Sequence, residues 1–296
     1  MKVVELTPEQ YASLYTPECS VYDSPEFIAL NVRKTLDVKL MGLSDGGGKI
    51  YVAQAFGLKR NGWRAPFSAP FSIPLKSPEA RAGHIRQFYG MLTEELGQKA
   101  EITFPADCYG FNDVPEYEDT ILDYNYHYPM ERLQDYESHL SRSGRYNHHR
   151  AQKHPFKFIE THDIARAYEI IKKNREAMGY PLAMSLDEVM RTSPITHGRY
   201  FVLTLDRRDV AAAVVFHPVP GVAQVIYWGD IPEARQFRAM NSLPWHLFNW
   251  YAHHYPEIHT IDIGPSSTDG EINRGLADYK LSIGCVETYK PTIILR

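Results

Sequence analysis

The chain has 296 residues, of which 44% are hydrophobic, and it carries a formal net charge of −4 at pH 7. A chain of this length and composition can build a substantial apolar core, so it is not a largely disordered protein, and it has room for two domains. The slight acidic excess argues against a protein that coats nucleic acid through its overall charge, and it leaves room for one local basic site.

The cysteines are few and far apart, at Cys19, Cys108 and Cys285. No pair has metal-ligand or redox spacing, which suits a reducing compartment. Residues 1–7 lack the apolar core of a signal peptide, and no apolar run approaches the about 18–20 residues that a membrane span needs. The paired histidines 148–149 and 253–254 point in different directions on a helix, so we predict no metal site. We expect a cytoplasmic protein without a transmembrane segment.

The first half alternates strands and helices. Ser24 followed by Pro25 is typical of a helix start, with the serine as N-cap and the proline at the first helical position. Glycines at 46–48 favour a tight turn between two apolar runs. The expected elements are a helix over 22–33, strands over 38–43 and 50–58, a helix over 78–97 and a strand over 101–105.

The segment 133–154 is dense in charge, and we place the boundary between two domains near it. A helix over 163–178 follows, and then a second one over 186–191, where Ser185 and Glu188 have the spacing of a capping box. We therefore predict an N-terminal domain over 1–130, a basic helical connector over 131–158 and a C-terminal domain over 159–296.

The last third carries the clearest pattern. Two apolar runs around a Pro/Gly turn predict a hairpin of strands over 211–216 and 222–231. Apolar residues at spacings of three and four predict a helix over 240–255, with Ser242 as its N-cap so that Pro244 falls in the first turn. A strand over 259–264, a short helix over 273–282 and a strand over 286–295 complete it.

This order, together with Asp262-Ile263-Gly264, the run Asn273-Arg274-Gly275-Leu276 continuing to Tyr279-Lys280, and Gly284, resembles the GNAT (Gcn5-related N-acetyltransferase) fold. Ser24 to Phe27 and the basic segment between the halves are similar to the FemABX-like branch, whose chains carry two GNAT-like domains in tandem. The resemblance implies an α/β protein of two such domains, each a mixed central sheet flanked by helices, the first one degenerate. It also implies acyl or aminoacyl transfer from an activated donor to an amine.

In the GNAT fold the donor lies where two neighbouring strands part, and backbone N–H groups there can hold a developing oxyanion. The resemblance places Tyr227, Trp228 and Asp230 at this point, opposite Asp262, Gly264 and Ser266. The alternative for Tyr227 and Trp228 is ordinary packing, since aromatic residues are common in strands.

Three residues are candidates for proton transfer. The resemblance makes Tyr279 the acid that protonates the departing thiolate, and a phenolic pKa near 10 suits a group that must stay protonated. Asp230 and Asp262 are candidates to accept the proton of an amine. The alternatives are that Tyr279 packs, that Asp230 caps a turn, and that Asp262 accepts hydrogen bonds from the following loop.

Three further residues begin or line the short helix. Asn273 suits a helix N-cap, Arg274 could meet a phosphate or carboxylate, and Lys280 belongs to the matching motif. The basic segment 142–157 could bind the phosphates of coenzyme A, a tRNA or an anionic lipid precursor; the alternative is a solvated helix face.

One element of the family pattern is missing. Residues 230–241 contain no glycine, whereas enzymes that use acetyl-CoA usually carry a glycine-rich pyrophosphate loop there. The donor therefore stays open between acyl-CoA or acetyl-CoA and aminoacyl-tRNA. The expected acceptor is a small-molecule amine or a cell-envelope precursor, and the alternative function is a non-catalytic GNAT-like binding module.

Overall fold

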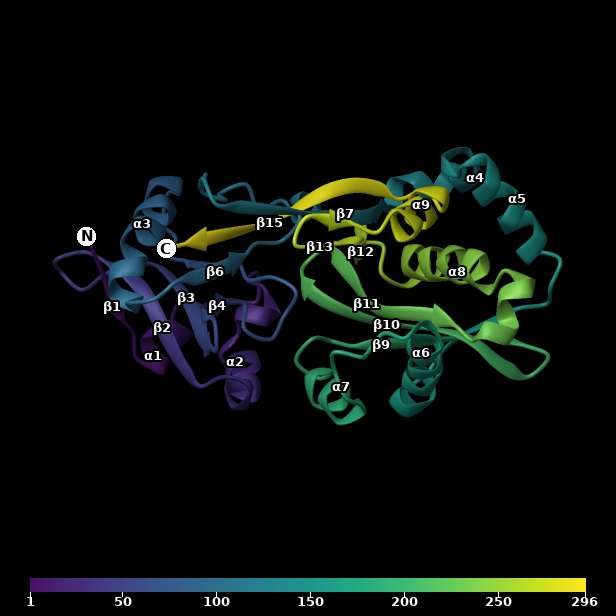
Figure 1. The fold of residues 1–296 in the computed structure, drawn as a ribbon, viewed down its shortest axis with the longest axis horizontal. Coiled ribbons are helices and arrows are strands. Elements are labelled where there is room, and N and C mark those ends of the chain that lie inside the picture. Colours follow the sequence, from purple (N-terminus) through teal and green to yellow (C-terminus); the bar gives the residue numbers. More distant parts are fainter. The chain divides into compact units, whose positions relative to one another are not determined.

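The computed structural model describes all residues 1–296, which divide into two compact units (Figure 1). Unit 1 consists of residues 1–124, 268–271 and 289–296, and unit 2 of residues 125–267 and 272–288. No helix is both long and apolar enough to cross a membrane.

These units differ from the expected domain ranges 1–130, 131–158 and 159–296. The basic segment is part of unit 2 and is not a separate connector. The last strand, β15 (Val286–Leu295), ends in unit 1, where Thr292 pairs with Thr103 and Leu295 with Ala100 of β6. A boundary drawn from charge density misses this return because the pairing partner lies far away in sequence.

Unit 1 is a mixed sheet with helices on both faces. Its strands follow the order β1-β2-β3-β4-β6-β15, with β5 beside β3, and β4 and β6 are the parallel pair. Its remaining elements are β1 (Lys2–Glu5), α1 (Pro8–Ala12), α2 (Pro25–Asn31), β2 (Asp37–Ser44), β3 (Ile50–Lys59), β4 (Gly62–Ala65), β5 (Leu75–Lys76), α3 (Ala82–Leu96) and β6 (Ala100–Thr103).

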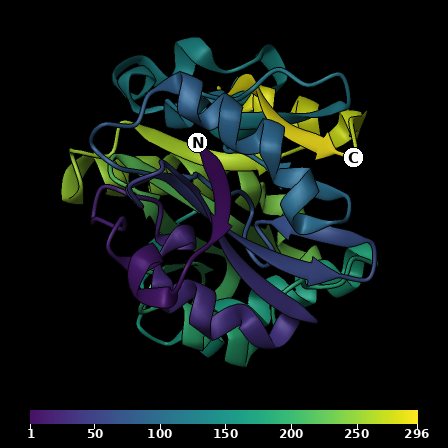
Figure 2. The ribbon, with the colours of Figure 1, turned by 90° about the vertical axis from the view of Figure 1, so that its left-hand side faces the viewer.

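The alternation of side chains along β3 divides the core of unit 1 into two layers. Val52 and Phe56 pack with Phe88 of α3, whereas Ala53 and Ala55 pack on the side of α1 and α2. Figure 2 looks onto this unit, with α3 on one side of the strands and α1 and α2 on the other. The expected order of strand, strand, helix and strand is confirmed.

Unit 2 is a second mixed sheet, with strand order β7-β12-β11-β10-β9-β8. β7 (Thr120–Pro129) enters it from unit 1, and a small hairpin of β13 (Ser267–Thr268) and β14 (Glu271–Ile272) follows β12. The other elements are α4 (Tyr136–His139), α5 (Arg142–Ala151), β8 (Lys157–Glu160), α6 (Ile164–Met178), α7 (Leu186–Thr192), β9 (Arg199–Leu205), β10 (Arg208–Val219), β11 (Val222–Asp230), α8 (Ala239–His254), β12 (Thr260–Pro265) and α9 (Arg274–Ser282).

Helices cover both faces of this sheet. Ile171 of α6 and Val189 of α7 pack on Val202 and Val214, while Tyr251 of α8 meets Phe201 on the other face. Figure 1 shows α6 and α8 on opposite sides of β9, β10 and β11. The predicted caps at Ser24 and Ser185 are confirmed, the second as a complete capping box with Glu188.

The predicted start of α8 is wrong. The helix begins at Ala239, so Ser242 is an interior residue and Pro244 lies inside the helix rather than in its first turn. A 3₁₀ turn over Pro232–Phe237 leads into it, and Arg238 takes a left-handed conformation with φ of 61°. Arg238 therefore occupies the N-cap position that the sequence pattern assigned to Ser242.

Candidate functional site

The sheet of unit 2 opens between β11 and β12. These parallel strands pair only at Val222 with Thr260, Ala223 with Ile261 and Gln224 with Asp262. Beyond this point β11 stays with β10 as far as Asp230, while β12 stays with β7 as far as Pro265. The two neighbours therefore part after Gln224 and Asp262, and their facing backbone groups no longer complete one ladder.

A β-bulge lies at the opening. Val214 of β10 pairs with Tyr227, and the next residue, Val215, pairs with Val225, so Ile226 is an extra residue in β11. A bulge bends its strand, increases the local twist and redirects the side chains that follow. The bulge therefore helps to turn β11 away from β12 and fixes which face each later side chain takes.

Tyr227 and Trp228 lie on opposite faces of the sheet. Tyr227 is buried in the layer of α6 and α7, where its hydroxyl accepts a 3.1 Å hydrogen bond from the Met184 N–H. Burial raises the pKa of Tyr227. Gly229 also faces α6, since a Cβ there would lie 2.5 Å from Asn174. Alternation then turns Trp228 and Asp230 toward α8 and α9.

Trp228 meets Tyr279 on this second face. Their ring centroids are 6.2 Å apart in an edge-to-face arrangement. The Tyr279 hydroxyl donates a 2.8 Å hydrogen bond to the carbonyl oxygen of Met240 in α8. Burial raises the pKa of Tyr279 well above its ordinary value, and Cys285, Tyr136 and Asp230 raise it further, in that order. The phenol is therefore held neutral at the end of β11.

Asp230 is a buried carboxyl at the last position of β11. Burial raises its pKa, and the Arg235 guanidinium opposes this shift with its Nε 3.7 Å from the carboxylate Oδ1. The Asn174 side chain fixes the backbone by donating a 2.7 Å hydrogen bond to the Asp230 carbonyl oxygen. A carboxyl in this setting takes up a proton at a higher pH than an exposed carboxyl does.

Asp262 has a different environment. Its carboxylate is 2% exposed and accepts hydrogen bonds from Asn125 Nδ2 at 2.8 Å, Gln224 Nε2 at 2.9 Å and Gly264 N at 3.0 Å. These donors join β7, β11 and β12 at the last paired position before the strands part. The structural alternative for Asp262 was a hydrogen bond from a backbone N–H just after it, and the bond from Gly264 N is of this kind. The carboxylate therefore holds the three strands together.

The other predicted residues lie at the end of β12, just after it, and in or at the start of α9. Lys280 is buried and donates to the carbonyl oxygens of Gly264 and Pro265, each at 2.8 Å. Ser266 is buried and its hydroxyl has no partner, while its carbonyl accepts from the Asn273 N–H. Asn273 caps α9 through Leu276, and Arg274 is exposed at the first helical position. Of these residues, Ser266 offers an uncommitted hydroxyl and Arg274 an exposed charge.

The basic segment forms α5 and the turn after it. α5 packs against α8 and α9, and a Cβ on its Gly144 would lie 1.9 Å from the Ser282 carbonyl oxygen, so only glycine allows this approach. Its outer surface, which we call the basic face, consists of exposed side chains at helical spacing: Arg142, Arg145, Tyr146, His149, Arg150 and Lys153. The basic face therefore lies on a helix that packs directly on the one carrying Tyr279.

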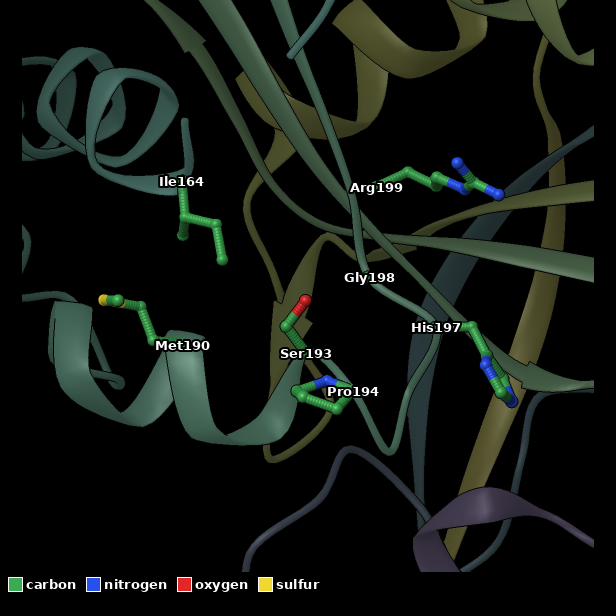
Figure 3. Close-up of a pocket in the computed structure, with 7 residues that line it drawn as sticks. All are labelled: Ile164, Met190, Ser193, Pro194, His197, Gly198 and Arg199. Atoms are coloured by element: carbon green, nitrogen blue, oxygen red, sulfur yellow. The ribbon is translucent and has the colours of Figure 1, made fainter. Parts of the chain in front are cut away.

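A separate pocket of ≈ 380 Å³ lies between α6, α7 and the start of β9 (Figure 3). Ile164, Met190 and Pro194 give it an apolar wall. Arg199 points away from that wall in Figure 3, and its guanidinium is paired with Glu160 at 2.8 Å. The pocket therefore presents little free charge, and sequence patterns gave no sign of it.

The structure thus places Trp228 against Tyr279, with Asp230 on the same face of β11, and it places Tyr227 on the other face. Sequence reasoning missed Arg235, Asn174 and Met240, which set the environments of Asp230 and Tyr279. Pro244 was a visible signal for Met240, since a proline inside a helix leaves a carbonyl without its donor. No cluster of three or more His, Cys, Asp or Glu side chains is placed to hold a metal ion.

Comparisons with known proteins agree on the fold. No family model and no curated protein sequence matches the chain. Among solved structures it is similar to FemX, with a TM-score of 0.64 and 10% identity over 100% of this chain and 98% of that one. It is also similar to L-PGS from Bacillus licheniformis, with a TM-score of 0.56 and 12% identity over 99% of this chain and 92% of that one. A third similar structure is a tandem GNAT protein from the clavulanic acid biosynthesis pathway. Its TM-score is 0.52, with 9% identity over 99% of this chain and 98% of that one. The expected tandem GNAT/FemABX-like fold is confirmed.

Proposed function

We propose that this chain transfers an acyl or aminoacyl group from an activated donor to an amine, with Asp230 as the base and Tyr279 as the acid. The observation that carries the proposal is the contact of Trp228 with Tyr279 on the face of β11 that also carries Asp230, at the point where β11 has parted from β12. A non-catalytic module has no need of a buried carboxyl and a half-buried phenol with raised pKa values at one end of a strand, and this pair supports an enzyme.

Asp230 and Tyr279 together account for both proton transfers of the proposed reaction. The amine nitrogen attacks the carbonyl carbon of the donor, and its proton passes to the Asp230 carboxylate. The bond from that carbon to the leaving sulfur or oxygen then breaks, and the Tyr279 hydroxyl protonates the leaving atom. Backbone N–H groups of β11 beyond the bulge are candidates to hold the intermediate oxyanion, because no β12 partner faces them.

The donor is either a coenzyme A thioester or an aminoacyl-tRNA ester. The 3₁₀ turn over Pro232–Phe237 occupies the place of the missing glycine-rich loop, which weakens the case for coenzyme A. The basic face on α5 suits a polyanion such as tRNA, because Arg and Lys make charge-assisted bonds with phosphates. FemX and L-PGS share the fold, and the acceptor class we propose is a small-molecule amine or a cell-envelope precursor.

The test is thermal unfolding with coenzyme A, acetyl-CoA, longer acyl-CoA species or tRNA, since a ligand that binds only the folded state stabilises it. At 100-fold excess over its Kd a ligand adds about 2.7 kcal/mol. We expect one donor class to raise the unfolding temperature, and Trp228→Ala to reduce the shift. A chain that none of them stabilises at millimolar coenzyme A species and micromolar tRNA contradicts the proposal and favours the binding module.

A further inference from the structure

Helix α8 contains a carbonyl whose usual donor, the N–H four residues later, is absent. In an α-helix the N–H of each residue bonds to the carbonyl four residues earlier. Pro244 lies inside α8 and has no N–H, so the carbonyl oxygen of Met240 lacks its helical donor. Pro244 is buried, and the helix continues past it to His254.

Tyr279 of α9 fills this gap. Its hydroxyl donates to that same Met240 oxygen at 2.8 Å. A phenol has one proton to donate and two lone pairs to accept with. Donation to Met240 therefore fixes where the proton lies and leaves the lone pairs of the phenolic oxygen directed elsewhere.

The contact favours the form that an acid must have. A carbonyl oxygen accepts from a neutral phenol but repels a phenolate, so this partner opposes loss of the proton. When a thiolate or alkoxide forms nearby, donation to that anion is the stronger, charge-assisted bond. Rotation of the Tyr279 hydroxyl about its C–O bond then turns its proton away from the Met240 oxygen and toward the leaving group, and the ring does not move.

We propose that Pro244 is a positioning residue for Tyr279: by removing the helical donor at residue 244, it frees the Met240 carbonyl to hold the Tyr279 hydroxyl in place. This inference rests on the proposed function for its catalytic purpose. The hydrogen bond from Tyr279 to Met240 exists whether or not the chain is an enzyme. Stability measurements therefore test the bond, and turnover measurements test its catalytic purpose.

The experiment is a double-mutant cycle of Pro244→Ala and Tyr279→Phe, followed by thermal unfolding. Pro244→Ala restores an N–H that can bond to Met240. Loss of the Tyr279 hydroxyl should lower the unfolding temperature by about 2–4 °C in the parent chain and by less than half of that in the Pro244→Ala chain. Equal losses in both backgrounds would overturn the inference. Pro244→Val, which keeps more side-chain volume, repeats the cycle if the alanine variant folds poorly.

Two further arms complete it. Tyr146→Phe, at a tyrosine that is 63% exposed, is the matched control and should have the same small effect in both backgrounds. In turnover, Pro244→Ala should lower kcat several-fold with the KM of the donor unchanged, and should have no effect on kcat in the Tyr279→Phe chain. If the two substitutions are coupled in thermal unfolding but the parent chain shows no turnover, the proposed function is overturned, and the catalytic purpose of Pro244 with it. An active enzyme without coupling would overturn the Pro244 inference alone.

Discussion

The hydroxyl of Tyr279 donates a 2.8 Å hydrogen bond to the carbonyl oxygen of Met240, which Pro244 has left without a helical donor. This bond joins α9 to α8 beside Trp228 and ties the candidate acid to a rigid element. It also makes a stability effect and a catalytic effect of Tyr279 separable.

Tyr279→Phe should lower kcat by about 10²-fold or more, the usual contribution of a positioned acid, with a smaller change in KM. It should also destabilise the fold by about 1 kcal/mol through the lost bond to Met240. Steady-state kinetics and urea unfolding measure the two effects. A tyrosine that only packs would show the loss of stability without the loss of kcat.

The activity of the enzyme should fall on the acid side as Asp230 takes up a proton. The base must be ionised, and burial raises the pKa of Asp230, so the rate rises with pH through that raised pKa. Arg235→Ala removes the cation that favours the ionised form, and it should move this acid limb to higher pH. Arg208→Ala, at an exposed arginine on β10, is the control and should leave the limb in place. An acid limb unmoved by Arg235→Ala contradicts the role of Asp230.

Asp262→Asn and Asp230→Asn should separate a structural carboxylate from a catalytic one. Three donors converge on Asp262, and an amide group there turns its own N–H toward one of them, so we expect a loss of about 2–3 kcal/mol in urea unfolding. Asp230→Asn removes a buried charge and should cost much less stability while abolishing most activity. Equal losses of stability would contradict this division.

Unit 1 should become less stable as the pH rises from about 4 to 7. Asp23 is 3% exposed, and burial raises its pKa to about 7 against the donors Ile73 N and Ser72 Oγ. A carboxyl whose pKa is raised by folding stabilises the folded state, and this contribution is complete below the pKa of the unfolded chain, near 3.8. It is lost as the pH rises through the pKa of the folded state, about 7. The difference between a pKa of 3.8 and one of about 7 corresponds to about 4 kcal/mol of stability. Asp23→Asn should flatten the dependence of urea unfolding on pH; an unchanged slope would exclude Asp23 as its source.

The basic face should bind polyanions in a salt-dependent way if the donor is tRNA. Replacing Arg142 and Lys153 by glutamate should weaken tRNA binding and reduce the slope of log K against log salt by about one for each lost phosphate contact. The matched control is Lys172→Glu with Lys173→Glu, two exposed lysines on α6. Equal weakening by both sets would indicate a general charge effect rather than a site.

The fold was largely predictable because its signals are local. The Pro/Gly turn before β11, the cap at Ser185 and the β-branched run of β15 each depend on neighbouring residues, and all three are in place. Pairings between distant segments were not predictable, which is why the return of residues 289–296 to unit 1 was missed. The start of α8 depends on Arg238 in a conformation that favours glycine, and the sequence gives no sign of this.

The candidate site was predictable in part for the same reason. The motif pointed to Trp228, Asp230 and Tyr279, and in the structure Trp228 contacts Tyr279 on the face of β11 that carries Asp230, while their roles in catalysis stay a prediction. It gave no means of placing Tyr227 and Trp228 on opposite faces or of telling Asp230 from Asp262. Those distinctions depend on the bulge at Ile226 and on Asn125 and Gln224, which come from other strands.

The most direct test of the central claim is a transfer assay with the parent chain, Asp230→Asn and Tyr279→Phe, using acyl-CoA and aminoacyl-tRNA donors against a panel of amines. We predict an amide product from one donor class, with its rate reduced about 10²-fold or more in each folded variant. Turnover that both variants retain in full would contradict the account of the site. The absence of product from every donor, with a folded parent chain, would contradict the transferase itself.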